Sequence, residues 1–205
     1  MNKNIIISKM SFDEALDASL ALAKKIEEEG LTDFGVIGIA IGGILPAKII
    51  SEYFKCPLIV IKIARPMTSM KKYFLLDRLP NKLKKTLRRI EMSLGFYRLM
   101  EKREIISIIG ELSQNKYVIV DDSLDTGKTV SAVVNLLEKD RKICNKNILI
   151  AVITQIFDDA VPKADCYIYK NYNFSFPWSR DSNEYAKFLD YCKKNPMLSS
   201  FQSLD

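Results

Sequence analysis

The chain has 205 residues, 48% of them hydrophobic and 27% charged, which is typical of a single globular domain with its own core. Its net charge is +6. The chain contains no histidine, and this absence excludes the common zinc sites and every histidine-based triad. Proton transfer would therefore fall to Asp, Glu, Lys or Tyr. The four cysteines are far apart, no apolar run approaches the ~20 residues that span a bilayer, and no signal peptide is evident. We expect a protein of the reducing cytoplasm.

A capping box opens the first predicted helix, because Ser11 is followed three residues later by Glu14. Apolar residues then recur at helical spacing until Gly30 ends the helix, and we expect its role to be structural.

Two predicted strands follow, each leading into a segment of interest. Phe34–Ala40 runs into Ile41-Gly42-Gly43 and a helix over Leu45–Phe54, and such a glycine turn can point backbone N–H groups at an anion. Pro57–Ala64 ends beside two cations, Lys62 and Arg65, which either reach a ligand or are simple surface charges.

Residues 65–103 form a basic insert, with twelve Lys and Arg against three Asp and Glu, a net of +9 in a chain whose total is +6. Apolar residues recur there at helical steps and predict a helix with one apolar stripe: Leu83, Leu87, Ile90, Leu94 and Tyr97. The insert is either an extra helix or lid with a solvated basic face, or a surface for an acidic partner or substrate or for membrane phosphates. No recognition motif supports nucleic acid.

The central segment is Tyr117–Thr129, Y-V-I-V-D-D-S-L-D-T-G-K-T. An apolar strand ends in Asp121 and Asp122, a short loop carries Asp125, and an amphipathic helix follows from Val130 to Lys139. The helix N-terminus suits a phosphate, and the acids suit sugar hydroxyls and a divalent cation. Together these features predict a site for a phosphorylated sugar.

Two other interpretations of this segment are weaker. A nucleoside-triphosphate P-loop requires glycine five residues before the Gly-Lys pair, where this chain has Asp122. An ordinary surface turn with acids that cap a helix would account for one carboxylate, but less well for three beside Thr-Gly-Lys-Thr.

The remaining pattern predicts the fold. Strands over Asn147–Phe157 and Ala164–Lys170 complete an alternation of strands and helices, which indicates one α/β domain over residues 1–205 with an open, mainly parallel sheet and helices on both faces. A ligand then lies at the carboxyl ends of the strands, where the motifs fall. The aromatic, proline-marked stretch Asn173–Asp181 holds the only tryptophan of the chain.

The run Val118–Val130 resembles the signature of the type I phosphoribosyltransferases, which bind 5-phosphoribosyl 1-pyrophosphate (PRPP). The resemblance covers most of 34–181 outside the basic insert. It implies a small hood at about 170–182, Mg²⁺ as cofactor, and a homodimer as a common assembly.

The resemblance also implies roles for individual residues. Asp121 and Asp122 would bind the ribose hydroxyls and help hold Mg²⁺, and Asp125 would act as general acid/base on the acceptor. The 5-phosphate would lie in the loop of Asp125, Thr126, Gly127, Lys128 and Thr129. The pyrophosphate would lie against Ala40, Ile41, Gly42 and Gly43, with Lys62 and Arg65 as candidate cations, although many relatives carry Arg or Lys at the position of Ile41.

Three acceptors or roles compete. A purine-like base is favoured by Asp125 and by the Phe-Pro-Trp segment, where Phe176 or Trp178 would stack on the base or else form a hydrophobic plug. A saccharide or lipid-linked glycan hydroxyl is favoured by Ile41 and by Thr154–Phe157, which lacks the lysine that purine-directed relatives use against the base. The third alternative is a PRPP-sensing regulator that binds nucleic acid through the basic insert.

Overall fold

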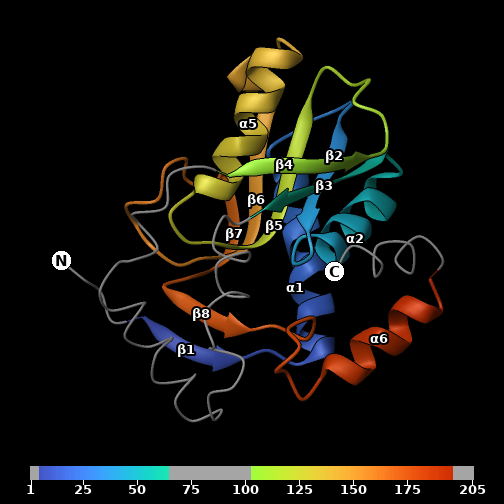
Figure 1. The fold of residues 1–205 in the computed structure, drawn as a ribbon, viewed down its shortest axis with the longest axis vertical. Helices are drawn as coiled ribbons and strands as arrows, with labels where there is room; N and C mark the ends of the chain where they lie inside the picture. The colour runs from blue at the N-terminus through green and yellow to red at the C-terminus, as the bar shows by residue number, and fades with distance from the viewer. Residues whose placement is uncertain (1–4, 65–102, 196–205) are drawn as a thin grey trace.

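The computed structural model describes residues 5–64 and 103–195. Its main sheet has six strands in the order β4-β3-β2-β5-β6-β7, and every neighbouring pair is parallel except β3 with β4. A separate parallel pair joins β1 to β8 (Figure 1). The strands are β1 Ile6–Lys9, β2 Gly35–Ala40, β3 Leu58–Ala64, β4 Glu104–Ile109, β5 Tyr117–Leu124, β6 Ile148–Gln155, β7 Cys166–Lys170 and β8 Tyr172–Ser175.

The helices cover both faces of the main sheet, as predicted. Among the described residues these are α1 Phe12–Glu28, α2 Ile44–Phe54 and α5 Lys128–Asp140; a further helix, α6 Tyr185–Lys193, lies away from the sheet, and a short 3₁₀ turn spans Asn145–Asn147. Alternate residues of the central strands divide between the two faces. Val118 and Val120 of β5 pack with α1 and α2, whereas Ile119 packs with α5. The open, mainly parallel α/β sheet is thus confirmed.

Strand β5 is longer than the sequence predicted. The pattern predicted an apolar strand that ends in Asp121 and Asp122, but pairing with β6 continues through Ser123 to Leu124. The reason is the length of β6, whose eight residues are all buried and offer hydrogen-bonding partners beyond the apolar part of β5. Ser123 and Leu124, which the sequence placed in the loop after the acids, therefore lie on strand backbone.

A third layer is built from the two ends of the chain. Strands β1 and β8 and helix α6 gather at one end of the molecule (Figure 1), and their aromatic side chains pack with the start of α1 and with α2. The hydroxyl of Thr154 on β6 donates to the carbonyl of Tyr172 on β8 at 2.8 Å, which ties this layer to the main sheet. This layer contains the predicted hood segment, and we call the assembly of β1, β8 and α6 the hood.

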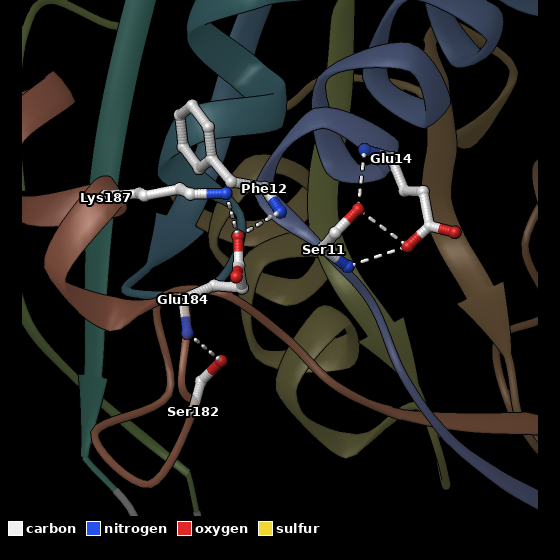
Figure 2. A network of polar contacts seen from close by, with 6 residues as sticks. All are labelled: Ser11, Phe12, Glu14, Ser182, Glu184 and Lys187. Carbon is white, nitrogen blue, oxygen red and sulfur yellow. Dashed lines mark hydrogen bonds and ion pairs between the residues drawn. The ribbon is translucent and has the colours of Figure 1, made fainter.

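A polar network fastens the hood to the N-terminus of α1. Ser11 and Glu14 form the predicted capping box, and the carboxylate of Glu184 accepts the backbone N–H of Phe12 at 3.3 Å (Figure 2). Lys187 pairs with the same carboxylate at 3.0 Å. An acid at a helix N-terminus is favourable because it meets unpaired N–H groups.

Most of the basic insert, including its predicted apolar stripe, lies outside the described residues. Strand β4, which follows it, was not predicted. It forms an antiparallel edge of the sheet, with Ile106, Ile108 and Ile109 exposed on it.

Candidate active site

The two carboxylates at the end of β5 point to opposite faces of the strand, as adjacent strand residues do. Asp121 is buried, and one of its oxygens accepts the backbone N–H of Asp122 at 2.9 Å. Asp122 is half-buried and accepts two further hydrogen bonds, one on each oxygen. Oδ1 accepts from the Ser123 hydroxyl at 2.9 Å, and Oδ2 accepts from the indole N–H of Trp178 at 2.7 Å.

The predicted pyrophosphate loop lies directly against Asp122. A Cβ added to Gly42 would stand 2.1 Å from Oδ2 of Asp122, and one added to Gly43 would stand 2.3 Å from the carbonyl oxygen of Val120. Backbone atoms leave room only for glycine at position 43, and a side chain at position 42 would displace the Asp122 carboxylate. The peptide bond between Ala40 and Ile41 is cis, and Ile41 is exposed. The structure thus brings together two predicted parts of the site that are about eighty residues apart in the sequence.

The predicted phosphate loop links β5 to α5. Oδ1 of Asp125 accepts the backbone N–H of Thr126, and the Thr126 hydroxyl lies 3.3 Å from the same oxygen. Gly127 adopts φ +81° and precedes the first helical residue. Lys128 and Thr129 form the first turn of α5, which begins two residues earlier than predicted. The N-terminal turn of α5 follows the carboxylates of β5 along the chain, and a helix N-terminus in this position is suited to a phosphate.

The candidate cations are only partly placed. Lys62 on β3 pairs in register with Ala40 on β2, so it lies next to the start of the pyrophosphate loop. Arg65 lies outside the described residues. Sequence reasoning missed Lys170, which pairs in register with Gln155 at the ends of β7 and β6. Lys170 forms an ion pair of 2.8 Å with Asp158, whose hydrogen bond and charge raise the lysine's pKa. Lys170 lies thirteen residues beyond Phe157 in the sequence, and only the pairing of β7 with β6 brings it beside Gln155.

Phe176 and Trp178 lie inside the hood. They are 3% and 7% exposed, and their rings stack on each other with centroids 4.9 Å apart and planes 7° apart. Both rings are largely covered by other side chains of the protein, and stacking on an acceptor and the hydrophobic plug both stay predictions. The hydrogen bond from Trp178 to Asp122 spans 56 positions, and no sequence signal points to it.

The carboxylate pair fits Mg²⁺ in one respect, because this ion prefers carboxylate, water and substrate oxygens to an all-protein cage. Within 5–64 and 103–195, no group of three or more His, Cys, Asp or Glu side chains is arranged to hold a metal ion. The role of Asp121 and Asp122 as Mg²⁺ ligands stays a prediction. None of the helices in the described ranges is both long and apolar enough to span a bilayer.

Comparison with known proteins agrees with this geometry. Residues 12–184 match the family model described as a phosphoribosyl transferase domain. Among solved structures, a purine phosphoribosyltransferase from Pyrococcus horikoshii is 26% identical with a TM-score of 0.58, over 86% of this chain and 96% of that one. A xanthine-guanine-hypoxanthine phosphoribosyltransferase from Helicobacter pylori shares the fold, with 18% identity and a TM-score of 0.58 over 90% and 99% of the two chains.

A curated relative is similar over a shorter stretch. Ribose-phosphate pyrophosphokinase of Mycoplasma genitalium is 27% identical over 125 residues, which is 60% of this chain and 28% of that protein. The chain thus spans well under half of that relative's length.

Proposed function

Because the chain belongs to the phosphoribosyl transferase domain family, we propose that it transfers the 5-phosphoribosyl group of PRPP to an acceptor and releases pyrophosphate. The observation that carries this proposal is the contact between Gly42 and the carboxylate of Asp122. It joins a loop suited to an anion and an acid suited to sugar hydroxyls into one site, with the Asp125–Thr129 loop next along the chain.

Each part of the site would bind a different group of PRPP. Asp121 and Asp122 accept hydrogen bonds from the ribose hydroxyls, as ionised carboxylates do. The first N–H groups of α5 and the Thr126 and Thr129 hydroxyls hold the 5-phosphate. Backbone groups of Ala40–Gly43 face the pyrophosphate, with Lys62 as the nearby cation among the described residues. When bound, Mg²⁺ would supply positive charge to the leaving pyrophosphate.

Asp125 is proposed to take the acceptor's proton as the new bond to C1 of the ribose forms. The backbone N–H of Thr126 donates to Oδ1 and so orients the carboxylate. The other carboxylates at the end of β5 would stabilise positive charge that develops on the sugar as pyrophosphate leaves.

For the acceptor we propose a purine-like nucleobase. The support is the likeness to the Pyrococcus purine phosphoribosyltransferase and the presence of Asp125. A glycan hydroxyl is the second candidate, because the aromatic faces of Phe176 and Trp178 are stacked on each other and Thr154–Phe157 offers no lysine. The regulator alternative rests on the basic insert and is tested by binding of RNA and DNA across a range of salt concentrations.

The deciding experiment measures pyrophosphate release from PRPP and Mg²⁺ with a panel of purine bases and sugar acceptors, beside Asp125→Asn. We expect release that depends on one base, and a loss of about 10²-fold or more in kcat for Asp125→Asn with little change in PRPP affinity. Asp140→Asn is the matched control, since it makes the same change at the far end of α5 and should leave the rate unaltered.

Two other results would redirect the proposal. PRPP binding by calorimetry without release for any base would reject the nucleobase acceptor and point to glycans or regulation. Absence of PRPP binding in the unaltered protein would reject the transferase itself.

A further inference from the structure

We propose that Trp178 is a positioning residue, whose indole N–H holds the Asp122 carboxylate in the orientation that binds PRPP. PRPP is the phosphoribosyl donor, and its proposed binding site, the donor site, is thereby linked to the hood. This inference rests on the proposed function, because it takes Asp122 as a ligand of the PRPP ribose.

The contact itself is strong. Nε1 of Trp178 donates to Oδ2 of Asp122 at 2.7 Å, the short distance expected for a hydrogen bond to an ionised acceptor. Trp178 is 7% exposed, and a buried indole N–H requires a partner. The partner here is a proposed substrate ligand rather than a structural carbonyl.

The carboxylate has little freedom once this bond is made. Its other oxygen accepts the Ser123 hydroxyl at 2.9 Å, and Oδ2 faces the bare Cα of Gly42, where a Cβ would come within 2.1 Å. The Asp122 carboxylate therefore lies between the indole N–H of the hood and the backbone proposed to face the pyrophosphate.

Trp178 is in turn held by packing. Its ring stacks on Phe176 and meets Phe188 of α6 edge-on at a centroid distance of 6.1 Å. These aromatic side chains belong to the core cluster that joins the hood to α1 and α2. The hood therefore fixes the position of the indole N–H, and no hood side chain needs to contact the ribose.

The first test uses fluorescence, because Trp178 is the only tryptophan of the chain. Asp122→Asn without any ligand should shift the emission maximum or intensity, since the charge beside the indole N–H is removed. Titration of the unaltered protein with PRPP and Mg²⁺ should change the emission with the dissociation constant that calorimetry measures. An emission unaffected by Asp122→Asn would overturn the contact, whatever the protein's function.

The second test measures donor affinity in Trp178→Phe, which keeps an aromatic ring beside Phe176 but removes the N–H. We expect PRPP to bind about tenfold more weakly, and the KM for PRPP to rise by a similar factor with kcat within about twofold. Phe12→Leu is the control: it loosens the same core cluster through a ring that contacts Tyr191 rather than Trp178, and should lower the melting temperature but not PRPP affinity.

A double-mutant cycle separates positioning from a structural effect. If Trp178 acts through Asp122, Trp178→Phe should weaken PRPP binding little further in the Asp122→Asn background. Additive losses, or unchanged affinity in Trp178→Phe, would overturn the inference while leaving the transferase proposal intact. Failure of the unaltered protein to bind PRPP would instead reject the proposed function, and the positioning role with it.

Discussion

At the scale of single residues, close contacts at glycines shape the site. Gly42 and Gly43 let the pyrophosphate loop approach β5, and Gly127 allows the turn into α5. A Cβ on Gly127 would stand 2.3 Å from the carbonyl oxygen of Val161, so both its backbone angle and its surroundings require glycine. Gly30 also has a positive φ, but nothing lies within 4 Å of a Cβ placed there.

Gly30 and Gly127 both have a positive φ but differ in their surroundings, so the same substitution at the two positions can be compared. Gly30→Ala should cost about 1 kcal/mol of unfolding free energy, from the left-handed backbone alone. Gly127→Ala should cost about 2–4 kcal/mol, because the clash with Val161 adds to that strain and shifts the phosphate loop. Chemical denaturation of both variants measures the difference. Equal losses would show that the loop moves freely away from Val161.

At the scale of elements, the hood is attached to α1 by a charged network. Glu184 lies just before α6, and its carboxylate accepts from Lys187 and from the N–H of Phe12 at the start of α1 (Figure 2). These donors, the lysine first, lower the pKa of Glu184 below its usual 4.5. The unfolded chain therefore binds a proton here more readily than the folded one, and the network stabilises the fold above the unfolded pKa.

Glu184→Gln should accordingly lower the melting temperature at pH 7. The difference from the unaltered protein should shrink as the pH falls from about 5 to 3, where the native carboxylate is protonated and its contribution is lost. Thermal melts at several pH values test this. Glu138→Gln, at an exposed position of α5 outside the network, should show no such pH-dependent difference. A constant difference for Glu184→Gln would contradict the assigned cause.

At the scale of the whole molecule, we expect the protection of backbone amides against hydrogen exchange to differ between the strands of the main sheet. Strand β5 lies between β2 and β6, and Tyr117 to Val120 are fully buried. Strand β4 is at the edge of the six-stranded sheet, and its three exposed isoleucines have exposed fractions of 37–58%. Local opening costs least where few apolar contacts must be broken.

Hydrogen exchange followed by mass spectrometry should therefore show β5 and β6 exchanging only with global unfolding, and β4 exchanging much earlier. Equal protection of β4 and β5 would indicate that another surface covers this edge. Repeating the measurement at several protein concentrations would show whether that surface is a second copy of the chain, because only then does protection depend on concentration.

The sequence by itself determined the α/β class and the positions of the acidic and glycine loops. These are local properties: an apolar run such as Tyr117–Val120 specifies a buried strand, and the Asp, Gly and Thr residues after it specify a turn into a helix. The capping box at Ser11 and Glu14 is equally local, and the structure confirms it.

Only the tertiary structure decided what meets those residues. The extension of β5 to Leu124 depends on pairing with β6, the placement of Lys170 beside Gln155 depends on the register of β7, and the hood sheet unites β1 with β8 from opposite ends of the chain. The hydrogen bond between Trp178 and Asp122 joins β5 to the segment just after β8. Such contacts are set by the packing of segments that are distant in the sequence. Residue spacing and hydrophobic periodicity describe only neighbouring residues, so they do not predict these contacts.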